Sequence, residues 1–70
     1  MKIKFKDSFG RRIEVSAEKD DEGEICIFLA IYHNSYYGRS EHYRLNLEDA
    51  TRLKNALERA IREAISKMDA

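Results

Sequence analysis

The side chains in this sequence that could do chemistry are one cysteine, two histidines and the acidic residues near them. Cys26 is a potential nucleophile. His33, and His42 next to Glu41, are potential general acids and bases. Catalysis by such groups needs a concave pocket that tunes their pKa values, and a chain of 70 residues offers little concavity. We therefore expect a protein that is not an enzyme.

Metal and cofactor binding are not expected either. The acidic segment 18–23, Glu-Lys-Asp-Asp-Glu-Gly, is too short for a calcium-binding loop, which needs oxygen ligands at alternate positions and a distal glutamate. The single cysteine, Cys26, excludes an internal disulfide and a cysteine-rich metal site. It is interpreted as a small core residue in a reducing compartment, and segment 18–23 as a solvated loop.

The formal charge is neutral, with 13 basic and 13 acidic side chains. This argues against a strongly basic nucleic-acid-binding protein, although it does not describe how the charge is distributed. Residues 1–6 alternate charged and apolar side chains and lack the continuous apolar segment of a signal peptide. No run of residues has the length of a membrane span. We expect one domain over residues 1–70 that is soluble, cytoplasmic and without membrane contact.

The central element of the chain is an uninterrupted apolar or aromatic run from Ile25 to Tyr32. A short run that is rich in isoleucine is typical of a strand buried on both faces. We expect this strand near residues 24–33. Strand alternation divides its side chains between one face with Ile25, Ile27, Leu29 and Ile31 and another with Cys26, Phe28, Ala30 and Tyr32.

Two alternating segments precede the central strand and are predicted to form a hairpin near residues 2–7 and 11–17. Between them, Asp7 and Gly10 suit a type I turn followed by a glycine with a left-handed backbone. Closing this turn fixes the pairing of the two strands, and the pairing keeps apolar side chains on one face. The predicted pairs are Ile3 with Val15, Lys4 with Glu14 and Phe5 with Ile13.

After the central strand we expect a turn and then a fourth strand near residues 39–46, followed by a helix over 47–68. Asn46 is a suitable N-cap, and acidic residues follow it in the first turn of the helix. Apolar residues recur at helical spacing and form one stripe. The stripe consists of Ala50, Leu53, Leu57, Ala60, Ile61, Ala64, Ile65 and Met68.

These elements predict an α+β fold, a four-stranded antiparallel β-meander with one C-terminal helix packed on one face. The helix stripe is expected to cover Ile3, Phe5, Ile13, Val15, Ile25, Ile27, Leu29, Ile31, Tyr43 and Leu45. One helix covers only one face, so the other face stays open. That face collects Lys2, Lys4, Lys6, Arg12, Glu14, Ser16, Glu24, Cys26, Phe28, Ala30, Tyr32, His42, Arg44 and Asn46.

Three uses of the open face are considered. The favoured use is protein–protein contact, as a homodimer or as an accessory or inhibitor on a larger protein, because an exposed apolar patch of roughly 300–500 Å² usually marks an interface. This interface would comprise Cys26, Phe28, Ala30, Tyr32, Tyr36 and Tyr37. The alternative is single-stranded nucleic acid, contacted by Lys4, Lys6, Arg12, Phe28, Tyr32 and Arg44. In the third reading, lysine stems shield the patch and it binds nothing.

The order of four strands and one helix is similar to that of transcriptional coactivators of the positive-cofactor-four type. The segment Gly10-Arg11-Arg12-Ile13-Glu14-Val15 and the aromatic end of the central strand carry this resemblance. It covers most of the chain. At the level of fold analogy, it implies a curved meander, dimerisation and binding of single strands.

Overall fold

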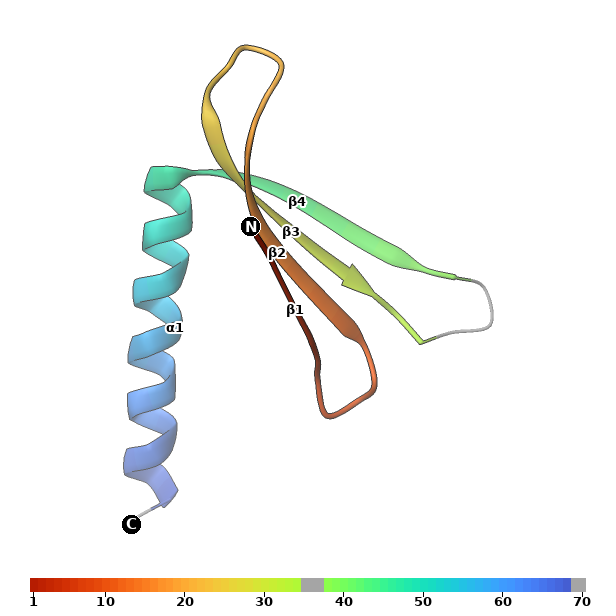
Figure 1. The fold of residues 1–70 in the computed structure, drawn as a ribbon. Helices are drawn as coiled ribbons and strands as arrows, with labels where there is room; N and C mark the ends of the chain where they lie inside the picture. Colours follow the sequence, from red (N-terminus) through yellow and green to blue (C-terminus); the bar gives the residue numbers. More distant parts are fainter. Residues whose placement is uncertain (35–37, 69–70) are drawn as a thin grey trace.

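The fold is a single antiparallel sheet followed by one helix, as predicted (Figure 1). The structure, a computed structural model, describes residues 1–34 and 38–68. The sheet has the strand order β1-β2-β3-β4. Its elements are β1 (Lys2–Lys6), β2 (Arg12–Lys19), β3 (Ile25–Tyr32), β4 (Ser40–Asn46) and the helix α1 (Leu47–Met68).

The β1–β2 turn has the predicted geometry. Gly10 has a φ of 81°, a left-handed conformation that glycine adopts without a steric penalty. The backbone N–H of Asp7 donates to the carbonyl of Arg11 at 2.9 Å, and its carboxylate accepts from the N–H groups of Phe9 and Arg11 at 2.9 and 2.8 Å. The predicted pairing of Ile3 with Val15 and of Phe5 with Ile13 is therefore confirmed.

The β2–β3 connection repeats this turn, which the sequence analysis missed. Asp20 accepts the N–H groups of Glu22 and Glu24, each at 2.9 Å, and Gly23 has a φ of 83°. The spacing from Asp20 to Gly23 is the same as that from Asp7 to Gly10. The expected solvated loop 18–23 is consequently shorter, and β2 continues to Lys19.

The register of the sheet separates the side chains into the two predicted faces. Val15 lies opposite Leu29, and Leu29 lies opposite Tyr43, so these three share the face toward α1. Glu14 lies opposite Ala30, which lies opposite His42, on the other face. The predicted division of side chains is thus confirmed across all four strands.

The helix α1 begins directly at the end of β4. The side-chain oxygen of Asn46 accepts the backbone N–H of Asp49 at 2.7 Å, so Asn46 is the N-cap. From this junction α1 diverges from the sheet, and its C-terminal end lies far from the strands (Figure 1). Among the described elements, α1 approaches β3 and β4, but neither β1 nor β2.

The chain is extended for its size. Its radius of gyration is 14.9 Å, whereas a compact domain of this length has about 11 Å. Its accessible surface is 6282 Å², whereas a folded monomer of this mass exposes about 4,500 Å². Among the described apolar residues, Cys26 is the one that is buried, with 5% of its surface exposed.

The second turn provides a test of the fold. We expect Gly23→Ala to lower the free energy of unfolding by about 1 kcal/mol, because a side chain disfavours the left-handed backbone. No atom lies within 4 Å of the added methyl group, so the loss reports backbone strain alone. Urea unfolding at fixed protein concentration measures it, with Gly23→Asn as the control that loses less. An unchanged stability for Gly23→Ala would contradict the turn geometry.

Candidate interaction site

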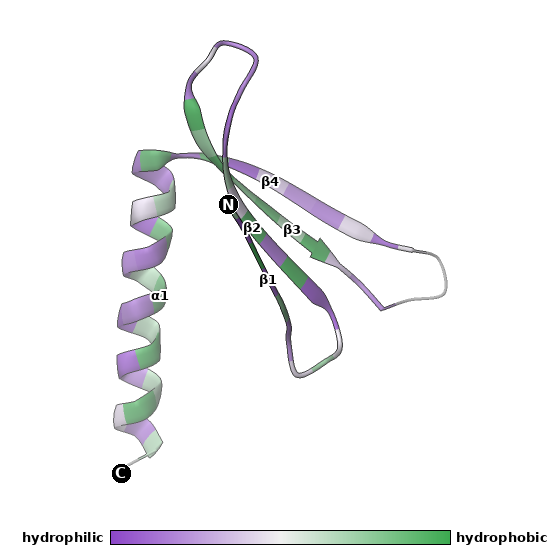
Figure 2. Cartoon of the chain, viewed as in Figure 1, coloured by the Kyte–Doolittle hydropathy of each residue, from purple (hydrophilic) through white to green (hydrophobic). Residues whose placement is uncertain are grey.

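An open apolar cleft lies between α1 and the sheet. Figure 2 shows hydrophobic segments of α1 mainly on the side that faces the sheet. The cleft has a volume of about 320 Å³ and one charged residue, Lys54, in its lining. Its walls are formed by Phe5, Ile13, Val15, Ile27, Leu29 and Leu45 from the sheet and by Ala50, Leu53, Lys54 and Leu57 from the helix.

The apolar walls of this cleft are exposed to a degree that the sequence analysis did not predict. Phe5 and Leu57 are each 54% exposed, and Ile61, which lies beyond the cleft on α1, is 56% exposed. The helix was expected to cover the whole apolar face of the sheet, but its angle to the sheet leaves β1 uncovered. The large apolar residues that remain about half exposed are Ile3, Phe5, Ile25, Tyr43, Leu47, Leu53, Leu57, Ile61 and Ile65.

The opposite face of the sheet is closed by charged side chains. Glu14 and Ser16 are each only 8% exposed. The carboxylate of Glu14 lies 3.5 Å from the ammonium of Lys2 and 3.0 Å from the Nε of Arg12. Partial desolvation raises the pKa of Glu14, but the charges and hydrogen bonds of Lys2 and Arg12 outweigh it, so this pKa lies below its usual value of 4.5.

The residues predicted to form the interface lie together on this closed face. Cys26 is buried, and Phe28, Ala30 and Tyr32 are half-buried. The guanidinium of Arg12 covers the ring of Tyr32 at 4.3 Å. Tyr36 and Tyr37, which belong to the same predicted interface, lie outside the described residues.

The ring of Tyr32 also meets the ring of His42 edge to face, with centroids 5.6 Å apart. A shallow cavity of about 150 Å³ lies beside it, lined by Glu14, Phe28 and Ala30 among others. Burial in one copy does not test binding, so the interface on this face stays a prediction. The larger exposed apolar surface is on the other side of the sheet.

The residues predicted to contact nucleic acid share the closed face too. Lys4 lies opposite Glu14, and Arg44 lies opposite Phe28. Lys6 and Arg12 are neighbours across β1 and β2. Of these cations, Arg12 is engaged by Glu14 and by Tyr32, so the face presents less free positive charge than its composition indicates.

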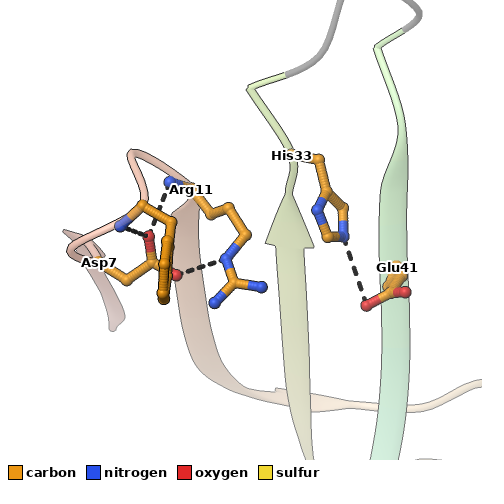
Figure 3. A network of polar contacts seen from close by, with 5 residues as sticks. Asp7, Arg11, His33 and Glu41 are labelled. Atoms are coloured by element: carbon orange, nitrogen blue, oxygen red, sulfur yellow. Dashed lines mark hydrogen bonds and ion pairs between the residues drawn. The ribbon is translucent and has the colours of Figure 1, made fainter.

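Figure 3 shows two polar pairs at one end of the sheet, His33 with Glu41 and Asp7 with Arg11. The Nε2 of His33 lies 3.5 Å from the carboxylate of Glu41, whose side chain is about half exposed. Near it, Arg11 donates to the carboxylate of Asp7. Partial desolvation raises the pKa of Asp7, but the hydrogen bonds from Arg11 and Phe9 outweigh it and hold this pKa below 3.8. These contacts fix the strand ends.

Two further findings concern possible functions. Within residues 1–34 and 38–68, no group of three histidine, cysteine or acidic side chains is placed to hold a metal ion. The described helix does not combine the length and the apolar character that crossing a membrane requires.

The exposed apolar surface that the sequence analysis missed is formed by the outer half of the helix stripe and by β1. The lengths of the predicted helix and strands could have indicated that the helix extends beyond the sheet. A helix of 22 residues is about 33 Å long, whereas strands of five to eight residues span roughly 17–27 Å. One end of such a helix extends beyond the sheet, whatever its angle.

Comparison of the chain with protein-family models, with curated proteins and with solved structures finds no match. The resemblance to coactivators therefore rests on the order of elements and on the loose pattern in segment 10–15 and at the end of the central strand. What the chain does has to be argued from its own surfaces.

The ion pairs on the closed face predict a pH dependence. Because the pKa of Glu14 is lower in the folded state, ionised Glu14 stabilises the fold above the usual pKa of 4.5, and this contribution is lost as pH falls through the lower, folded-state pKa. We expect the free energy of unfolding to decline between about pH 5 and pH 3, and Glu14→Gln to flatten the decline.

Urea unfolding across this pH range measures the effect. Lys2→Met and Arg12→Met each remove one of the two cations beside Glu14, so each should flatten the decline in part. A Glu14→Gln variant with the same pH slope as the unmodified protein would show that these pairs do not stabilise the fold.

Proposed function

We propose that the chain is a non-catalytic protein–protein interaction module that functions as a homodimer, and that two copies meet through the apolar cleft between α1 and the sheet. The observation that carries this proposal is the excess of exposed surface. The chain exposes 6282 Å², about 1,700 Å² more than a folded monomer of its mass.

The excess is of the right size and kind for a stable interface. The half-exposed apolar residues of α1, β1, the start of β3 and the middle of β4 present on the order of 1,000 Å², and a standard interface buries about 800 Å² per partner. Three of them, Phe5, Leu53 and Leu57, also line the cleft. Exposed apolar surface on this scale is typical of an interaction surface.

A second copy of the chain fits the cleft better than an unrelated partner. The cleft needs an occupant with a long apolar stripe, and α1 presents such a stripe itself. The charges beside the stripe pair within the helix, as in Lys54 with Glu58 at 3.9 Å and Glu63 with Lys67 at 3.4 Å. With a formal charge of zero, two copies do not repel one another.

Light scattering of concentrated protein tests this proposal. We expect a dimer, and we expect Leu57→Asp to give a monomer, because an aspartate in the cleft would be desolvated without a partner. Leu57 is 54% exposed in one copy, so the substitution spares the isolated fold. Asn55→Asp is the matched control, because it adds the same charge about 200° around the helix and leaves the dimer intact.

A Phe28→Asp variant distinguishes the two faces. If the dimer forms through the cleft, this variant stays dimeric. If the dimer forms through the closed face predicted from the sequence, Phe28→Asp gives the monomer and Leu57→Asp does not. An unmodified protein that is monomeric at high concentration contradicts the homodimer and leaves docking on a foreign protein, as an accessory or inhibitor.

Binding of single-stranded nucleic acid is the second candidate. The feature that favours it is the grouping of Lys4, Lys6 and Arg44 on one face with Phe28. The features that weigh against it are the buried carboxylate of Glu14 and the engagement of Arg12 by Glu14 and Tyr32. The cleft has no such competing charges, so self-association is the better-supported function.

A salt titration with a labelled mixed-sequence oligonucleotide tests the second candidate. If Lys4, Lys6 and Arg44 each contact a phosphate, the logarithm of the binding constant should fall with the logarithm of salt concentration with a slope near −2. Lys6→Ala should then reduce the slope. Fluorescence anisotropy measures the binding, and no binding at low salt excludes this function.

A further inference from the structure

We propose that the two copies exchange the outer halves of their helices. In this arrangement Ile61, Ile65 and Met68 of each copy pack on Ile3 and Phe5 of the other copy's sheet. The inference rests on the proposed homodimer and specifies how it is built. The apolar face of each sheet is then covered in part by helix residues of the second copy.

The outer half of α1 is not covered by apolar side chains of residues 1–34 and 38–68 in its own chain. Side chains of α1 line the cleft only as far as Leu57. Beyond it, Ile61 and Ile65 remain more than half exposed, and Met68 is 83% exposed. The helix diverges from the sheet in this part (Figure 1), although its apolar stripe continues to its end.

The β1 side of the sheet lacks a cover in the same chain. The helix approaches β3 and β4, and it does not approach β1 or β2 within the described residues. Ile3 is 52% exposed and Phe5 is 54% exposed, although both lie on the face of the sheet that is turned toward α1. The chain therefore carries one uncovered stripe and one uncovered strand.

A dimer with a two-fold axis covers both the outer half of the α1 stripe and the apolar side of β1. In a two-fold dimer the same patch of each copy is used, and a contact from the helix of one copy to the sheet of the other is repeated in reverse. Pairing of the helices alone would leave Ile3 and Phe5 exposed. Pairing of sheet edges alone would leave Ile61 and Ile65 exposed as well. Exchange of the helix ends buries all four.

The polar side of α1 determines how the exchanged helix lies. Arg59 and Arg62 are exposed on the side away from the stripe, so the helix cannot pass between two apolar walls. It lies with its stripe on the other sheet and passes alongside the other helix. Ala60 and Ala64 on the stripe are small enough to allow this close approach of the two helices.

Cross-linking between single-cysteine chains tests the exchange. One chain carries Cys26→Ser with Phe5→Cys, and the other carries Cys26→Ser with Ile65→Cys. The two are unfolded, mixed, refolded and treated with a short bismaleimide, and the mixed product is identified by mass. Because groups held in one complex react at a millimolar effective concentration, this product should form about 1,000-fold faster than between free chains at micromolar concentration.

The matched control replaces Ile65→Cys with Asn55→Cys, which lies on the polar side of the helix and should give little mixed product. A dimer by light scattering in which Phe5→Cys and Ile65→Cys do not cross-link overturns the exchange and leaves the homodimer standing. A monomer by light scattering overturns both. Rapid formation of the mixed product supports both.

A measurement on the unmodified protein guards against damage by the cysteine substitutions. Equal amounts of ¹³C-labelled and unlabelled chains are refolded together, and isotope-filtered NMR detects only contacts between copies. The exchange predicts contacts from the methyl groups of Ile65 to the ring of Phe5. Contacts between copies that join Ile65 only to other helix residues would overturn it.

Discussion

The direct connection of β4 to α1 is the constraint on which the rest of the structure depends. The strand ends at Asn46 and the helix begins at Leu47, so no linker residue absorbs a change of angle. The backbone N–H of Asp49 donates to the side-chain oxygen of Asn46, and this hydrogen bond fixes the first turn of α1. The negative charges of Glu48 and Asp49 in this turn stabilise the positive N-terminal end of the helix. The helix therefore leaves the sheet along a set direction, which holds its outer half away from the strands (Figure 1).

In most sheets the apolar face is the better buried one, but in this sheet the face with charged residues is better buried than the apolar face. The face that carries Glu14 and Ser16 is the better buried, because Lys2 and Arg12 lie across it and supply counter-charges. The face that carries Val15 and Leu29 opens onto a cleft. Charged side chains can close a face within one chain, whereas an apolar cleft can be closed only by more apolar surface. This difference is why the proposed assembly uses the cleft.

The sequence predicted local features well and the relation of helix to sheet poorly. The turn at Asp7 and Gly10 determined the β1–β2 register, because a fixed turn leaves one pairing that keeps the apolar side chains together. Strand alternation assigned each residue to its correct face for the same reason. Alternation says nothing of the angle of α1, so the exposure of Phe5 and Leu57 was not predicted. Burial of Cys26 was predicted, but the closing of its face by Lys2 and Arg12 depends on side-chain conformations that no sequence pattern specifies.

Because the chain is small, covering the open cleft would also contribute to the stability of the fold. A domain of 70 residues has little stability to spare, since a single core of this size contributes only about 3–5 kcal/mol. Here one copy buries Cys26 and leaves the larger apolar side chains of both cleft walls partly exposed. In the proposed dimer, the residues that join the copies are the same residues that form the core of each. Association then adds stability to the fold that each copy forms, and the population of folded chains depends on protein concentration.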